Sequence, residues 1–165
     1  MAAIHKISPC LWFDTHAEDA AKFYISVFPH SRILRVSHYL EAGKEIHGHE
    51  PGSVMTVDFE IAGFPLTALN GGPQFKFSES ISLQVMCDTQ DEIDHYWDKL
   101  GAGGDPNSQQ CGWLRDKFGL SWQIVPVKLA DLIADADPAK AGRTMNAMLQ
   151  MKKLDIERLE QAHAA

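Results

Sequence analysis

The sequence predicts an α+β fold in which two tandem β-α-β-β-β modules form a cup-shaped mixed sheet, followed by a C-terminal helical extension. Three observations predict this fold. A strand pattern that leads into a helix pattern occurs twice, at 7–28 and at 81–100. A hairpin pattern at 110–126 closes the second repeat, and helical spacing continues after residue 127. We therefore expect a paired domain over 1–126, with modules at about 5–70 and 80–126, and an extension over 127–165 that packs on the body or on a partner subunit.

Composition excludes several classes of function. The 165 residues are 45% hydrophobic and 22% charged, which is ordinary for a globular protein. The net charge of -7 and the absence of a Lys/Arg cluster argue against nucleic-acid binding. No apolar run approaches the roughly 20 residues of a membrane-spanning helix, and the N-terminus lacks a signal-peptide core. We expect a cytoplasmic protein with neither a nucleic-acid nor a membrane partner.

The repeat is the strongest signal for the paired modules. Residues 7–15 align with 81–89, with Ile, Ser, Asp and Thr in matching places, and each Asp-Thr pair is suited to begin a helix. The helices expected at 17–28 and 91–100 correspond as well, because Phe23-Tyr24 takes the place of Tyr96-Trp97. The sequence therefore contains a duplicated strand-helix unit.

Three strands should follow each helix. In the first module we expect strands at 32–40, 53–61 and 64–69, with Ala62-Gly63 as a tight turn. The linker 70–80 contains Gly71-Gly72-Pro73. In the second module the pattern predicts a weak edge strand and then two hairpin strands, at 105–109, 111–115 and 120–125.

The last hairpin strand has two faces of unequal polarity. Leu120, Trp122 and Ile124 share one face and should lie under a helix. The other face carries Ser121, Gln123 and Val125. By strand alternation we expect the cavity to be completed by Ile7, Pro9, Leu11, Phe13, Ile81, Leu83, Val85 and Cys87. An apolar cavity with few polar groups is typical of a small-molecule pocket.

Rim residues complete the predicted pocket. The rim candidates are Asn70, Phe75, Phe77, Cys111 and Trp113. From the cavity and the rim together, the residues that we expect to contact a ligand are Leu11, Phe13, Asn70, Val85, Cys111, Trp113 and Gln123. The expected ligand is a small apolar or aromatic molecule.

Helical spacing continues after the hairpin. We expect a short helix at 127–134 and a longer one that begins at Asp137-Pro138 and runs to about residue 162. Its apolar stripe consists of Met145, Met148, Leu149, Met151, Leu154, Ile156 and Leu159. Such a stripe predicts packing against the body or a partner subunit, and the alternative is a mobile lid over a pocket.

Several motifs in order resemble a known family. They are Trp12-Phe13-Asp14 with Ala17-Glu18 and Phe23-Tyr24, then Ala68-Leu69-Asn70-Gly71-Gly72, then Cys111-Gly112-Trp113-Leu114, Gly119 and Ser121-Trp122-Gln123-Ile124-Val125-Pro126. Over residues 5 to 126 the chain resembles the PhnB-like, or "3-demethylubiquinone-9 3-methyltransferase" domain, family. That family is part of the vicinal oxygen chelate superfamily of glyoxalases, bleomycin-resistance proteins and extradiol dioxygenases. The resemblance implies paired β-α-β-β-β modules and a homodimer.

The resemblance also implies four facing positions for a divalent metal. These positions fall on Ile7, Thr67, Ile81 and Gln123, and a slip of one residue would substitute Ser8, Ala68 and Ser82. None of these side chains is a histidine or carboxylate, the usual ligands of a catalytic divalent ion. We therefore expect no metal and no other cofactor. The one dense alternative is the loop sequence His47-Gly48-His49-Glu50.

No catalytic motif stands out. The sequence has no glycine-rich loop placed between a strand and a helix, as common S-adenosylmethionine enzymes have, and no nucleophile elbow. Cys10, Cys87 and Cys111 are too few and too scattered for a disulfide framework or a zinc site. Cys111 is a candidate nucleophile only if Arg115 or a helix end activates it. We assign no catalytic residue.

These observations favour a metal-independent module that binds a small molecule and forms a homodimer. The first alternative is an enzyme, which would be a metal-dependent lyase, isomerase or dioxygenase, or the methyltransferase that the family label names. The second is a structural dimer in which the cup has collapsed.

Overall fold

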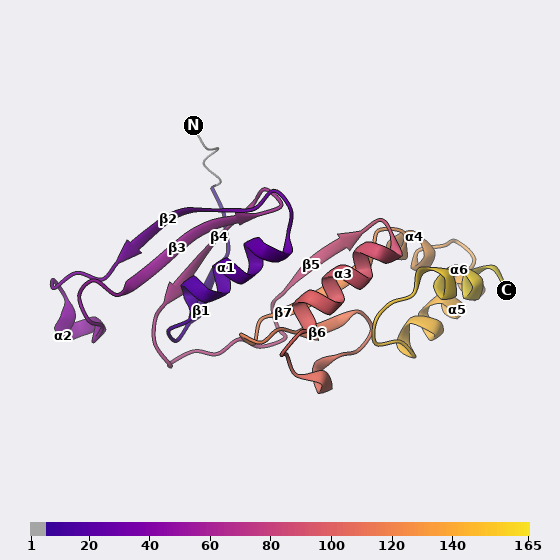
Figure 1. Ribbon diagram of the computed structural model, residues 1–165. Helices are drawn as coiled ribbons and strands as arrows, with labels where there is room; N and C mark the ends of the chain where they lie inside the picture. The colour runs from indigo at the N-terminus through magenta and orange to yellow at the C-terminus, as the bar shows by residue number, and fades with distance from the viewer. Residues whose placement is uncertain (1–5) are drawn as a thin grey trace. The chain divides into compact units, whose positions relative to one another are not determined.

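The computed structural model describes residues 6–165, so residue 5, where the first module was expected to begin, lies outside the described part. The chain divides into two compact units, Met1–Lys76 and Phe77–Ala165, and each is described by itself. Each unit contains a mixed sheet with a helix against it (Figure 1). The predicted α+β class is confirmed.

The first unit is a four-stranded sheet in the order β1-β4-β3-β2. Strand β1 runs parallel to β4, and the other neighbours are antiparallel. The elements are β1 (Cys10–Phe13), α1 (Ala17–Val27), β2 (Arg32–His38), α2 (Lys44–His47), β3 (Val54–Ile61) and β4 (Phe64–Asn70). Ala62 and Gly63 form the predicted tight turn between β3 and β4, with φ of 47° and 78°. Positive φ at both central residues is what a two-residue hairpin turn requires.

Helix α1 covers one face of this sheet. Its buried side chains are spaced at helical intervals, and Tyr24 stacks on Phe59 of β3 with ring centroids 6.3 Å apart. The amide oxygen of Asn70, at the end of β4, accepts a hydrogen bond of 2.8 Å from the N–H of Ala17. This bond satisfies one of the backbone donors that the start of a helix leaves unpaired.

The second unit has a three-stranded sheet in the order β5-β7-β6. Strand β5 runs parallel to β7, and β6 is antiparallel to β7. The elements are β5 (Ser82–Cys87), α3 (Gln90–Gly101), η1 (Pro106–Ser108), β6 (Trp113–Arg115) and β7 (Ser121–Pro126). Thr89 and Glu92 form a capping box that begins α3, so the prediction for the second Asp-Thr pair is confirmed. The same prediction for Asp14-Thr15 is wrong, because α1 has His16 at its N-cap and no side-chain cap.

The prediction of an edge strand at 105–109 is wrong. This segment forms the short helix η1, in which the carboxylate of Asp105 accepts from the N–H of Asn107. Pro106 stands at the first helical position, where its fixed φ and missing N–H suit a helical turn better than a strand. The second sheet therefore has one strand fewer than predicted.

Strand β6 begins later than expected, at Trp113 instead of residue 111. Cys111 and Gly112 have φ of 51° and 83°, which is incompatible with a strand. Their N–H groups donate to the carbonyl oxygens of Met151 and Lys152, each at 2.8 Å. The C-terminal extension therefore contacts the hairpin through backbone hydrogen bonds.

The extension consists of α4 (Leu129–Ile133), α5 (Pro138–Leu149) and α6 (Ile156–Ala164), so the single long helix expected up to residue 162 is wrong. Helix α5 ends at Leu149. The carbonyl oxygens of Met151 and Lys152 accept hydrogen bonds from the hairpin, so they are not available to continue the helix. It begins again where Asp155 caps α6 by accepting from the N–H of Arg158. Leu129, Met151, Leu154 and Leu159 form a buried cluster between these segments.

Gln90 joins the extension to α3. Its side-chain amide donates to the carbonyl of Leu154 at 3.2 Å and accepts from the N–H of Ile156 at 2.9 Å. Between residues 6 and 165, no helix is both long enough and apolar enough to cross a membrane.

Candidate functional site

Each sheet has one face under a helix and one face without a helix, and the two faces divide the predicted pocket residues. Leu11 pairs with Ala68, and Phe13 pairs with Asn70, which contacts the start of α1. Both side chains are buried on the α1 side. Val85 pairs with Ile124, which is fully buried beneath α3. The placement of Leu11, Phe13 and Val85 in a cavity opposite the helix is therefore wrong.

The error has a physical cause. Strand alternation was correct, but the apolar set of β1 and β5 packs against the helices, where it forms the core. The face without a helix receives the intervening residues, which are Cys10 and Trp12 in β1 and the more polar set Ser82, Gln84 and Met86 in β5. In β7 the predicted faces are confirmed, with Trp122 and Ile124 buried and Gln123 on the opposite face.

Asn70 is buried, and its side chain is used for structure. Besides accepting from Ala17, its amide group donates to the carbonyl of Val54 at 3.0 Å. Its backbone carbonyl accepts from the hydroxyl of Tyr39 at 2.6 Å. Asn70 thus connects α1, the start of β3 and the end of β2, so it is not a rim residue with a free amide.

The helix-free face of the second sheet is the strongest candidate site. The strand register places Gln84, Gln123 and Trp113 in one row across β5, β7 and β6. The next row consists of Ser82, Ser121 and Arg115. We call these six residues the polar face. Met86 and Val125 pair at its other end.

Hydrogen bonds connect the two rows of the polar face. The amide nitrogen of Gln123 donates to the hydroxyl of Ser82 at 2.7 Å, and that of Gln84 lies 3.4 Å from the amide oxygen of Gln123. Gln84 is exposed, while Gln123, Ser82 and Trp113 are partly exposed. Neutral donors and acceptors next to an indole ring therefore remain accessible from this side.

Ser121 differs from its neighbours. Its side chain is 1% exposed, and its hydroxyl has no hydrogen-bond partner. Buried hydroxyl groups are nearly always paired, because an unpaired one costs about 1–3 kcal/mol. This group is therefore an unused donor and acceptor in the row between Ser82 and Arg115.

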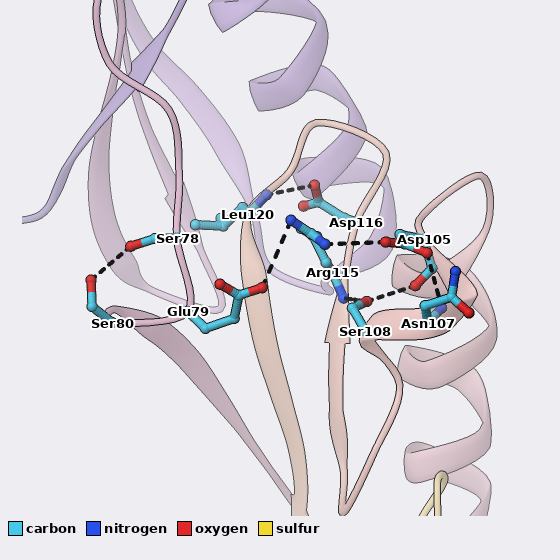
Figure 2. A network of polar contacts seen from close by, with 9 residues as sticks. All are labelled: Ser78, Glu79, Ser80, Asp105, Asn107, Ser108, Arg115, Asp116 and Leu120. Carbon is cyan, nitrogen blue, oxygen red and sulfur yellow. Dashed lines mark hydrogen bonds and ion pairs between the residues drawn. The ribbon is translucent and has the colours of Figure 1, made fainter.

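Arg115 is held by two carboxylates (Figure 2). Its guanidinium lies 3.1 Å from a carboxylate oxygen of Asp105 and 3.7 Å from one of Glu79, and its backbone N–H donates to the hydroxyl of Ser108 at 3.0 Å. Glu79 lies in the segment before β5, and Asp105 caps η1. The positive charge of Arg115 is thereby balanced within the second unit.

Two of the three thiols have raised pKa values. Burial, and then the carboxylates of Glu92 and Asp88, raise the pKa of Cys87 to about 12. Partial burial and then Asp58 raise the pKa of Cys10. Cys111 lies outside the polar face in a left-handed turn, and its expected partner Arg115 is paired with carboxylates.

The residues at the expected metal positions do not fit a divalent ion. Gln123 and Ser82 are hydrogen-bonded to each other, and Thr67 donates to Asp58 at 2.7 Å. Ile7 and Ile81 are 90% and 73% exposed and have no donor atom. Neutral amide and hydroxyl oxygens are poor substitutes for imidazole and carboxylate at a catalytic metal. Among the described residues there is no group of three or more His, Cys, Asp or Glu that could hold an ion.

The loop sequence His47-Gly48-His49-Glu50 packs on an aromatic ring. The rings of His47 and His49 lie 4.6 Å and 4.2 Å from the ring of Tyr39. The Nδ1 atom of His47 accepts from the N–H of His49 at 3.0 Å, and Glu50 pairs with Lys44. These contacts place both histidine rings against Tyr39 in the β2–β3 loop, while the buried Nε2 atom of His47 has no hydrogen-bond partner.

Comparison with known proteins identifies the family. The model of the 3-demethylubiquinone-9 3-methyltransferase family matches residues 5–125. The chain belongs to this family. The predicted PhnB-like family is confirmed. No curated protein sequence matches the chain.

Solved structures agree with this membership. A PhnB protein from Bacillus cereus is 34% identical, and the match covers 74% of this chain and 99% of that one, with a TM-score of 0.62. A protein from Pseudomonas aeruginosa is 18% identical over 74% of this chain and 98% of that one, with a TM-score of 0.56, and so shares the fold. Helices α4 to α6 lie beyond residue 125, where the family match ends.

The sequence missed three features of this site. Gln84 and the Ser82–Gln123 hydrogen bond depend on the register of β5 against β7, which the repeat alone does not specify. The pairing of Arg115 with Glu79 and Asp105 depends on loops that have no sequence signature.

Proposed function

We propose that the protein is a metal-independent module that binds a small molecule with an aromatic or apolar body on its polar face. The observation that supports this most is the row of Gln84, Gln123 and Trp113, an indole ring beside two amide groups on a face that no helix covers. Binding sites for small molecules commonly combine an aromatic surface with a few polar groups.

The two parts of this row have separate tasks in the proposal. The ring of Trp113 offers area for stacking, which favours flat ligands. The amides of Gln84 and Gln123 fix the orientation of the ligand through directional hydrogen bonds. Met86 is about half exposed and extends the apolar part of the surface.

We propose binding without a metal because the side chains at this face are poor metal ligands. Gln123 and Ser82 bond to one another through neutral groups, and an ion would have to replace that bond with weaker ligands than histidine or carboxylate. Changes of His47 or His49 should therefore leave ligand binding intact.

A second candidate function comes from the family description, which would make the protein a methyltransferase. The discriminating measurement is calorimetric titration with S-adenosylmethionine. The binding proposal predicts no heat of binding, whereas saturable binding would favour the enzyme and redirect attention to methyl transfer.

Nuclear magnetic resonance of the isotopically labelled full chain tests the binding proposal. Mixtures of flat aromatic compounds are added in the presence of a chelator, and the signals of the Gln84 and Gln123 amides and the Trp113 indole are followed. These signals should shift first. Gln123→Ala should abolish the shifts, and Gln161→Ala, which removes an amide from α6, should not. Shifts confined to the 41–53 loop, or seen only with added metal, would contradict the proposal.

We also propose that the protein is a homodimer, as the family resemblance implies. Sedimentation equilibrium over a range of concentrations measures this directly. A mass of twice 18.4 kDa is the expected result, and a monomer at every concentration would contradict it.

A further inference from the structure

We infer that the polar face selects ligands without net charge, so that an aromatic amide binds in preference to the carboxylate of the same shape. This inference rests on the proposed function and names the ligand class for the same face. It depends on three observations in the second unit: the charge around Arg115, the neutral groups of the glutamine row and the unpaired hydroxyl of Ser121.

The charge balance opposes an anionic ligand. Arg115 is the cation that the strand register places among the six residues of the polar face. Its guanidinium already contacts Asp105 at 3.1 Å and Glu79 at 3.7 Å, so one positive charge is shared between two negative ones. A ligand carboxylate would compete with these groups for Arg115 and would be repelled by both. The net charge of -7 adds to this repulsion at longer range.

The glutamine row suits a neutral amide. The 3.4 Å contact between Gln84 and Gln123 is longer than a good N–H···O bond, so the Gln84 amide gives up little when it turns toward a ligand. A primary amide carries both donors and an acceptor, and a ligand amide carries the same set. Two amides can therefore form paired hydrogen bonds. A carboxylate can only accept, so the amide oxygen of Gln84 would face a negatively charged carboxylate oxygen.

Ser121 adds a group that the free protein does not use. Its hydroxyl is buried, unpaired and in the row between Ser82 and Arg115. A hydroxyl can donate to a carbonyl oxygen or accept from an N–H, so it can pair with either side of an amide. Because Ser121 is only 1% exposed, a ligand pairs with its hydroxyl only after neighbouring groups move aside; the pairing then removes a cost that is already present in the free protein.

Matched pairs of ligands test the inference on the full chain. Benzamide is compared with benzoate, and nicotinamide with nicotinate, by the quenching of tryptophan fluorescence and by the shift of the Gln84 and Gln123 amide signals at neutral pH. The amide of each pair should bind at least about tenfold more tightly. Equal or tighter binding of the acids would overturn the inference while leaving the proposed function intact. If neither member of any pair shifts these signals, the proposed function fails and this inference fails with it.

Two variants separate the causes. Glu79→Gln removes one of the two carboxylates at Arg115 and should strengthen carboxylate binding several-fold while leaving amide binding unchanged. Glu45→Gln makes the same change of charge in α2 and should alter neither. An unchanged amide-to-acid ratio in Glu79→Gln would overturn the charge argument.

Ser121→Ala tests the hydroxyl. It removes an unpaired buried group, so the free protein should be at least as stable as the wild type by denaturant unfolding, yet it should bind the amides several-fold more weakly. Unchanged amide affinity would show that the ligand does not use this group.

Discussion

Asp116 accepts hydrogen bonds that hold the turn leading into β7, the central strand of the polar face. It lies in the turn between β6 and β7, and its side chain is 2% exposed. One carboxylate oxygen accepts from the N–H groups of Phe118 and Leu120, at 2.8 and 3.1 Å. The other accepts from the indole nitrogen of Trp122 at 2.8 Å. This carboxylate therefore holds both the turn and the core side of β7.

The cost of its loss follows from these bonds. Hydrogen bonds to a charged acceptor contribute about 1.5–3 kcal/mol each, and a small replacement admits some water. We predict that Asp116→Ala lowers the free energy of unfolding by about 3–5 kcal/mol. Asp116→Asn keeps one oxygen for the two backbone donors but turns an NH2 group toward the indole N–H. We expect it to cost about 2 kcal/mol.

Urea unfolding followed by tryptophan fluorescence measures these changes, and the slope of the transition should stay constant. Asp105→Ala is the matched control, because it removes a more exposed carboxylate nearby and should cost about 1 kcal/mol or less. A loss below about 1 kcal/mol for Asp116→Ala would refute the view that buried hydrogen bonds to this carboxylate stabilise the hairpin.

Three further predictions concern the second unit and the thiols. Hydrogen bonds from Lys153 and then Gln90 lower the pKa of Asp94, so the stabilisation it gives is full above about pH 4 and disappears as the pH falls through the lowered pKa. Unfolding curves of the wild type and Asp94→Asn should differ by less than about 1 kcal/mol near neutral pH and converge in acid, and curves that diverge in acid would contradict this. Gln90→Ala should speed amide hydrogen exchange at the start of α6 by about tenfold without changing that of the first sheet, and equal protection would mean that the bridge to the extension is unimportant. Cys87, with a pKa of about 12, should stay unmodified by Ellman's reagent at pH 8, while the exposed Cys10 reacts. The number of thiols per chain that react rapidly should therefore be the same in Cys87→Ser as in the wild type.

Local signals predicted most elements of the fold. Thr89, from the Asp-Thr pair before α3, caps that helix, and Ala62-Gly63 forms the β3–β4 turn because both residues adopt positive φ. Such features depend on a few adjacent residues and can be read from their types. The break between α5 and α6 could not be predicted in this way. It depends on hydrogen bonds from the N–H groups of Cys111 and Gly112, which are distant in sequence, to the carbonyl oxygens of Met151 and Lys152.

The candidate site was predicted less well. Trp113 and Gln123 were identified because the hairpin alternation was strong, and they lie side by side in register. Leu11 and Val85 were placed on the wrong face, because alternation tells which residues share a face but not which face a helix covers. Only the packing of α1 and α3 decides that question, and it depends on contacts between segments far apart in the sequence.

The central claim is that the polar face binds its ligand without a metal. Calorimetric titration of the best aromatic amide into the full chain tests this most directly, first with a chelator and then after nickel, zinc, manganese or iron(II) is added. We predict the same dissociation constant within about twofold in every case, and loss of binding in Gln123→Ala. Binding that appears only with a stoichiometric metal ion would contradict the claim and make a metal-dependent activity the better explanation.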